Sequence, residues 1–203
     1  MNLHEELAAF WQTAGGNSLS GCTLKTHIDF LGVGDRVRPG AVVLCIGVGT
    51  GTWIARLADA GCEPHALDIA PAALARATAA KATYLDGAPL PADTFDLALS
   101  HWVSPHQPPT VLEAQIAAVV PALKRSGLFA LHYNGPFNWP GERDPRQPDI
   151  TPYQRCLNAC SVFAPERIAE MAAQAGGKVV ANFAREDWPK YYRRLYAAHI
   201  ARA

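Results

Sequence analysis

Short apolar runs alternate with amphipathic stretches along most of this sequence. The clearest run, AVVLCI at 41–46, has the length of a strand and no polar position, which is typical of a strand covered on both faces. Further strands are predicted at 64–68, 82–85, 95–100, 127–133 and 178–184, with a strand or helix at 191–201. Helices are predicted at 3–12, 20–31, 52–60, 71–80, 110–123, 151–160 and 165–175. This alternation predicts an α/β fold with a parallel sheet.

A glycine-rich loop, Gly47-Val48-Gly49-Thr50-Gly51, lies between the first strand and a helix. Glycine permits a positive φ and a close approach of backbone to ligand, and the start of a helix offers unpaired N–H groups. The G-x-G-x-G spacing differs from the dinucleotide pattern because position 52 is threonine, which argues against a nicotinamide-dependent oxidoreductase. Asp68 ends the second strand and can accept hydrogen bonds from ribose hydroxyls. The pattern therefore predicts a site for a nucleoside-containing cofactor.

Four ordered motifs resemble those of the class I S-adenosylmethionine-dependent methyltransferases. They are VLCIGVGTG, ALDIAPAALARA, LDGAPLPADTFDLALSHW and KRSGLFAL, and together they cover about residues 41–133. The resemblance implies a Rossmann-like methyltransferase fold, with a seven-stranded, mainly parallel sheet and helices on both faces. It also implies S-adenosyl-L-methionine as the cofactor.

The resemblance assigns a role to each position that matches a family motif. The cofactor-binding residues that it implies are Gly47, Val48, Gly49, Gly51, Asp68, Ile69, Asp86, Gly87, Ser100 and His101. The glycines would approach the methionine part of the cofactor, and Asp68 would bind the ribose hydroxyls. Asp86 would accept a hydrogen bond from the adenine amino group. Ser100 and His101 would lie near the methyl group. Cys45 departs from the family, which commonly has an acidic residue there to hold the ammonium group; it is either a small core residue or a weakened cofactor contact.

Histidines are the candidate bases. A hydroxyl or ammonium acceptor must lose a proton on methyl transfer, and histidine suits that role near neutral pH. His106 is the first candidate and His101 the second, both just past the fourth strand, and His132 ends the fifth. The alternative is that these histidines shape the pocket. No metal site is expected, because no third ligand accompanies His101 and His106.

A single domain is expected for the 203 residues. We divide it into an N-terminal helical lid at 1–35, a cofactor-binding core at 36–133, a substrate-side insertion at 134–160, and a C-terminal helix and strands at 161–203. The insertion is rich in proline, and long loops of this kind are often functional.

Charge narrows the range of partners. Eighteen Lys and Arg balance eighteen Asp and Glu, so no nucleic-acid partner is expected. The acidic start and the lack of a long apolar run argue against a signal peptide or membrane span, and the five scattered cysteines favour a cytoplasmic protein. The expected function is methyl transfer to an oxygen or nitrogen of a small-molecule acceptor. The alternative is a non-catalytic, cofactor-binding or regulatory methyltransferase-like protein, and the oligomeric state stays open.

Overall fold

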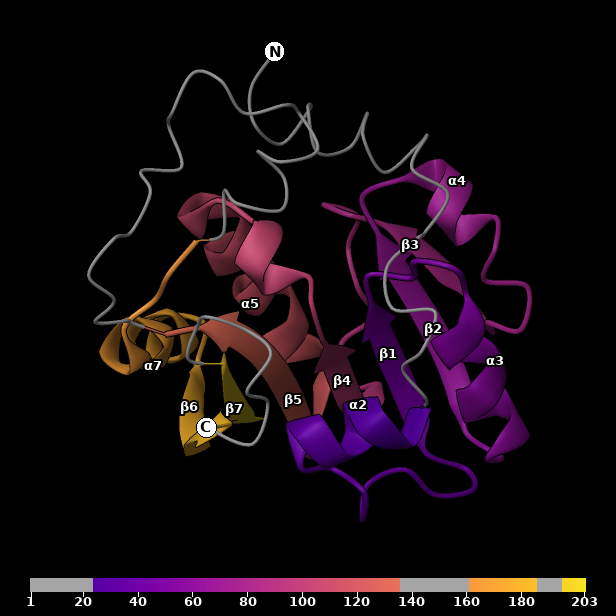
Figure 1. Cartoon of the computed structure of the whole chain (residues 1–203), viewed down its shortest axis with the longest axis horizontal. Helices are drawn as coiled ribbons and strands as arrows, with labels where there is room; N and C mark the ends of the chain where they lie inside the picture. Colours follow the sequence, from indigo (N-terminus) through magenta and orange to yellow (C-terminus); the bar gives the residue numbers. More distant parts are fainter. Residues whose placement is uncertain (1–23, 136–160, 186–194) are drawn as a thin grey trace.

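Seven strands pair into one sheet within residues 24–135, 161–185 and 195–203, the parts of the chain that the computed structural model describes (Figure 1). Their order is β3-β2-β1-β4-β5-β7-β6, and β7 is antiparallel to both of its neighbours. The strands are β1 (Val42–Ile46), β2 (Glu63–Asp68), β3 (Thr83–Leu85), β4 (Phe95–Ser100), β5 (Leu123–Asn134), β6 (Gly177–Arg185) and β7 (Leu195–Arg202). The predicted seven-stranded, mainly parallel α/β sheet is therefore confirmed, and the segment left open at 191–201 contains a strand.

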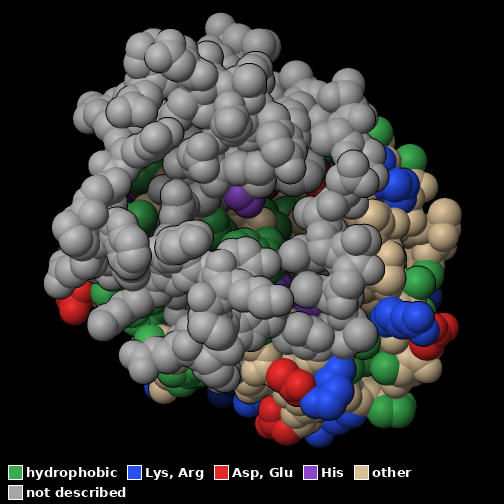
Figure 2. Space-filling model, viewed as in Figure 1, with side chains coloured by type: hydrophobic (Ala, Val, Ile, Leu, Met, Phe, Trp, Pro, Cys, Tyr) green, Lys and Arg blue, Asp and Glu red, His purple; other side chains and the backbone are tan. Residues whose placement is uncertain are grey.

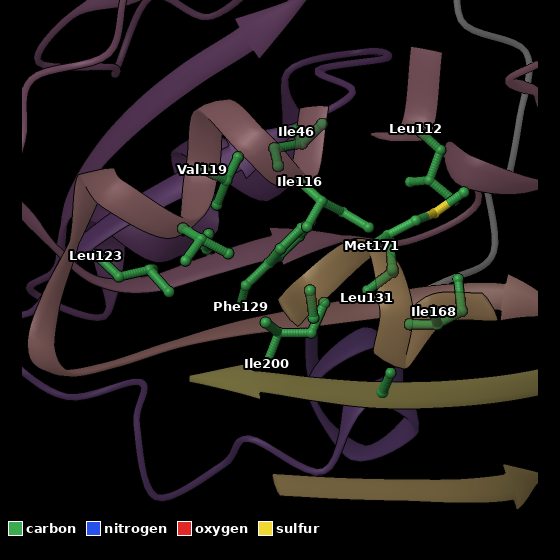
Figure 3. Close-up of a cluster of buried hydrophobic side chains, with 14 of the residues drawn as sticks. Ile46, Leu112, Ile116, Val119, Leu123, Phe129, Leu131, Ile168, Met171 and Ile200 are labelled. Atoms are coloured by element: carbon green, nitrogen blue, oxygen red, sulfur yellow. The ribbon is translucent and has the colours of Figure 1, made fainter. Parts of the chain in front are cut away.

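Helices cover both faces of this sheet. The described helices are α2 (Leu24–Leu31), α3 (Thr52–Asp59), α4 (Pro71–Leu74), the short 3-10 helix η1 (Ser104–His106), α5 (Pro109–Ala122) and α7 (Pro165–Gln174). Side chains alternate along each strand, so Val43 and Cys45 pack on the α2 and α3 side, whereas Leu44 and Ile46 pack on the α5 and α7 side. Figure 3 shows the second of these cores between α5, β5 and α7. Because both faces are covered, β1 has no polar position.

The helix predicted at 71–80 is too long. α4 ends at Leu74, and the chain continues in tighter turns in which the Arg76 N–H donates to the carbonyl of Ala73 at 2.9 Å. This path brings Arg76 to the glycine-rich loop, where its Nε donates to the Gly49 carbonyl at 2.8 Å. A tertiary hydrogen bond thus accompanies the early end of the helix.

β5 begins at Leu123, earlier than the predicted start at residue 127, and its pairing with β4 shifts register between Phe95 and Leu97. Gly127 lies in this irregular part of the strand. A Cβ there would come within 2.6 Å of the Phe95 carbonyl oxygen and 2.9 Å of the Lys124 carbonyl oxygen. The irregularity therefore requires glycine.

α2 packs against the sheet together with α3. Phe30 and Leu31 are 3% and 0% exposed, and His199 of β7 donates from Nε2 to the Leu31 carbonyl at 2.6 Å. The rest of the expected lid, the helices expected at 3–12 and 151–160, and most of the insertion expected at 134–160 lie outside the described residues.

Candidate functional site

The predicted site residues gather at the carboxyl ends of neighbouring strands. Gly47 follows β1, Asp68 ends β2, Asp86 follows β3 and His101 follows β4. The strand order reverses between β1 and β4, and ligands of open α/β sheets bind at such a switch point. The topology therefore brings together positions that are far apart in the sequence.

The three glycines of the loop have different surroundings. Their φ angles are +79°, +56° and +81° at Gly47, Gly49 and Gly51, a region that favours glycine. A Cβ at Gly47 would lie 2.2 Å from Val103 Cγ2, and one at Gly51 would lie 2.4 Å from the Arg76 carbonyl oxygen. A Cβ at Gly49 would meet no atom within 4 Å. The first and third glycines are thus required by packing, while the second faces open space that a ligand can use.

Asp68 connects the loop after β1 with the loop after β2. Its Oδ2 accepts the Val48 N–H at 2.7 Å and its Oδ1 accepts the Ala70 N–H at 2.9 Å. Burial raises the pKa of this carboxyl, while the N–H groups of Ala70, Val48 and Gly49 oppose the rise. Each carboxylate oxygen has a second lone pair, so Asp68 can still accept hydrogen bonds from hydroxyl groups of a ligand.

Asp86 and Gly87 lie beside Asp68 across the β2–β3 pair. The Asp86 N–H donates to the backbone carbonyl of Asp68 at 2.9 Å, and the Asp86 side chain is half-buried. Gly87 is exposed at φ +87°, with no atom within 4 Å of a Cβ built on it. Ile69 packs against the core on the α2 side. These positions form an accessible edge next to the carboxylate.

Ser100 and His101 are both buried at the end of β4. Ser100 is 0% exposed and its Oγ lies 3.3 Å from Ser104 Oγ. His101 is 4% exposed, and its Nδ1 is hydrogen-bonded to Nδ1 of His27 in α2. His27 was not among the predicted site residues, since only the packing of α2 brings it next to His101.

His106 lies in η1, where its N–H donates to the Val103 carbonyl at 2.9 Å and its side chain is half-buried. It is close enough to His132 to contribute, after burial, to lowering the pKa of that histidine. His101 and His106 are therefore in different environments, the first enclosed in the core and the second partly accessible. No group of three or more His, Cys, Asp or Glu side chains within the described ranges is placed to hold a metal ion.

Cys45 belongs to the core. It is 2% exposed, and burial raises the pKa of its thiol far above the ordinary value, with a smaller contribution from Cys62. A neutral thiol cannot replace a carboxylate as the partner of an ammonium group. The structure therefore supports the interpretation of Cys45 as a small core residue.

Two further residues contribute to the site through contacts that the sequence does not predict. Arg76 fixes the loop through Gly49, and it lies in a stretch predicted to be helical. Trp102 has φ +61°, which is rare for a bulky residue, and its N–H donates to His132 Nδ1 at 3.0 Å. Both residues lie within motifs quoted above, Arg76 in ALDIAPAALARA and Trp102 at the end of LDGAPLPADTFDLALSHW, but these local contacts depend on tertiary structure.

Comparison with known proteins agrees with this geometry. Residues 43–127 match the family described as Methyltransferase domain, and they contain the glycine-rich loop, Asp68, Asp86 and His101. This match and the seven-stranded sheet support the predicted family, the class I S-adenosylmethionine-dependent methyltransferases. The predicted family and cofactor are thus confirmed. A comparison with curated proteins gives no match.

Several solved structures share the fold. Magnesium protoporphyrin IX methyltransferase from Synechocystis PCC 6803, with bound SAM, has a TM-score of 0.70 at 13% identity, covering 100% of this chain and 98% of that one. The 1,6-didemethyltoxoflavin-N1-methyltransferase from Burkholderia thailandensis has a TM-score of 0.65 at 18% identity, covering 99% and 87%. The [4+2]-cyclase SpnF has a TM-score of 0.61 at 14% identity, covering 86% and 78%. Such low identities show a common fold and do not identify a substrate.

Proposed function

We propose that this enzyme transfers the methyl group of S-adenosyl-L-methionine to an oxygen or nitrogen atom of a small-molecule acceptor. The observation that carries the proposal is the pairing of the open Gly49 position with the Asp68 carboxylate, joined by the Val48 N–H at 2.7 Å. This arrangement fits S-adenosyl-L-methionine. The backbone at Gly49 can approach the methionine part of the cofactor, while the Asp68 carboxylate retains lone pairs for the two ribose hydroxyls.

The chain's own residues then have separable roles. The glycine-rich loop, with Gly47, Gly49 and Gly51, surrounds the methionine part of the cofactor. Asp68 binds the ribose hydroxyls, and Asp86 accepts a hydrogen bond from the adenine amino group. The bound cofactor supplies an electrophilic methyl group on a sulfonium, and the protein supplies position and a suitable protonation state of the acceptor. Val48, Ile69, Gly87, Ser100 and His101 complete the proposed cofactor contacts.

The acceptor side lies beyond β4 and β5. His106 and His101 are the candidate bases: His106 is half-buried and therefore partly accessible, whereas His101 is close to the predicted methyl position but enclosed. A small acceptor is favoured because the chain has no net charge with which to attract a nucleic acid. The two methyltransferases compared above act on small molecules, which agrees with this choice. No helix in the described ranges could cross a membrane.

A two-stage experiment tests the proposal. Calorimetry with S-adenosyl-L-methionine and its demethylated product measures binding, with Asp68→Asn expected to weaken affinity by about 10-fold or more, as loss of a hydrogen bond to a charged group implies. A screen of small alcohols, phenols and amines for formation of the demethylated product then measures transfer, repeated with His106→Ala and His101→Ala. Binding without transfer to any acceptor would favour a non-catalytic role, a class the shared fold does not exclude.

A further inference from the structure

Three buried histidines from three separate elements meet beside the carboxyl ends of β4 and β5. His27 of α2, His101 after β4 and His132 of β5 are 5%, 4% and 0% exposed. The ring centroids lie 4.6 Å apart for His27 and His101 and 5.1 Å apart for His101 and His132. Trp53 stacks on His27 at 4.4 Å, and Phe30 lies 4.6 Å from His101. Figure 2 shows histidine side chains among hydrophobic ones on the face viewed there.

Hydrogen bonds determine which nitrogens carry protons. His132 Nδ1 accepts the Trp102 N–H at 3.0 Å, so the neutral ring of His132 has its proton on Nε2. His27 and His101 are joined through their Nδ1 atoms, so one ring donates and the other accepts. When His101 is the donor, its Nε2 is an acceptor. Both His101 Nε2 and His132 Nε2 are buried without a hydrogen-bond partner in the described part of the chain.

With His101 as the donor to His27, the Nε2 atoms of His132 and His101 offer one donor and one acceptor, the combination that a hydroxyl or an amine N–H can satisfy. Buried polar atoms are rarely left unpaired, and each such exception calls for an explanation. Trp102 follows His101 in the sequence and donates its N–H to His132, and its φ is +61°. Backbone strain of this kind is concentrated at functional sites.

A histidine alone in this environment is a poor proton acceptor. Burial lowers the pKa of His27 to about 4 and, with a smaller contribution from His106, lowers that of His132 to about 3. Burial, followed by His132 and His27, holds the pKa of His101 well below its ordinary value. Within the described ranges, the titratable groups whose charges act on this cluster are its own histidines and His106. A proton shared along the bond between His27 and His101 spreads the charge over two rings.

We propose that His27 and His101 form a two-histidine proton relay that serves an O–H or N–H methyl acceptor, with His132 orienting that acceptor. The proposal rests on the function proposed above. The acceptor atom receives the hydrogen bond of His132 Nε2–H and gives its proton to His101 Nε2, while His101 passes its Nδ1 proton to His27 Nδ1. The electron pair left on the acceptor forms the bond to the methyl carbon, and the pair of the broken carbon–sulfur bond stays on sulfur. The positive charge lost at sulfur is thus gained by the histidine pair, which then releases the proton to solvent.

The first test needs no substrate. In full-length protein labelled with ¹⁵N-histidine, NMR should show a coupling across an N–H···N bond between the Nδ1 atoms of two histidines, together with an Nε2–H form of His132. The coupling should disappear in His27→Asn and persist in the control His199→Gln, because His199 also contacts α2 but lies outside the cluster. A wild-type spectrum without this coupling would overturn the relay.

The second test uses an acceptor identified by the screen. His27→Asn places an amide oxygen near the position of Nδ1, so it can orient His101 but cannot take up a proton. We expect kcat to fall about 10-fold or more, within the range of general acid–base catalysis, with KM for the cofactor little changed and the pH profile altered. His199→Gln should keep the wild-type profile. A His27→Asn enzyme with wild-type kcat and pH profile would overturn the relay and leave the methyl transfer intact, whereas no transfer by wild type would overturn both.

Discussion

His132 holds Trp102 in a left-handed backbone conformation. The imidazole Nδ1 accepts the Trp102 N–H at 3.0 Å, and the two rings meet edge to face with centroids 4.6 Å apart. The φ of Trp102 is +61°, a conformation that costs a residue with a Cβ about 1–2 kcal/mol. One side chain of β5 thus fixes the turn that leaves β4 and presents His101.

Replacing His132 should therefore lower the free energy of unfolding by more than replacing another buried histidine does. His132→Leu leaves a buried N–H without its acceptor, and we expect the free energy of unfolding to fall by about 1–3 kcal/mol in urea denaturation. His65→Leu is the matched control, since His65 is also buried but its ring contacts the Tyr84 hydroxyl and Glu63. Equal losses in the two variants would show that the Trp102 turn does not depend on His132.

The glycine-rich loop offers a pair of variants that separates folding from binding. Gly51→Ala would place a Cβ 2.4 Å from the Arg76 carbonyl oxygen, so we expect clear destabilisation in urea. Gly49→Ala meets no atom and costs only the left-handed conformation, about 1 kcal/mol. Calorimetry should instead show weakened cofactor binding for Gly49→Ala. Cofactor affinity at the wild-type level in that variant would mean that the ligand does not approach Gly49.

Stability should depend on pH through the buried histidines. The pKa of His27 falls to about 4 on folding, below the ordinary 6.5 of the unfolded chain. Between these values the unfolded state binds more protons, so the free energy of unfolding decreases as pH falls from about 6.5 towards 4. His27→Phe should reduce this dependence in urea titrations at several pH values, and the remainder should come from His101 and His132, whose pKa values burial also lowers. A wild-type curve that is level over this range would contradict the burial of neutral rings.

Cys45→Asp tests whether the core position can serve the cofactor. A carboxylate at a site that is 2% exposed must be buried without a partner, so we expect the variant to be less stable than wild type when no cofactor is present. If the carboxylate then pairs with the cofactor's ammonium group, saturating cofactor should raise the thermal midpoint of the variant more than that of wild type. An equal shift in both proteins would show that residue 45 is purely structural.

Local patterns predicted the strands better than the site. The apolar run at 41–46 located β1 within one residue because a strand covered on both faces needs apolar residues on each. The mostly apolar run FDLALS marked both ends of β4, and β2 was also located within one residue. The end of α4 could not be predicted, because a bond from Arg76 to a loop distant in sequence accompanies it. The contact between His27 and His101 could not be predicted either, because the two residues lie on different elements and meet only when α2 packs against the sheet.

The hydrogen bond from His199 to the last carbonyl of α2 also has a consequence for biosynthesis. The ribosome makes α2 early, yet the group that anchors its carboxyl end arrives only when β7 is complete. His27 cannot reach its partner His101 by local folding, because the two are 74 residues apart in the sequence, so their contact forms only after β4 has been synthesised. A truncated product that lacks β7 would therefore leave α2 without this anchor.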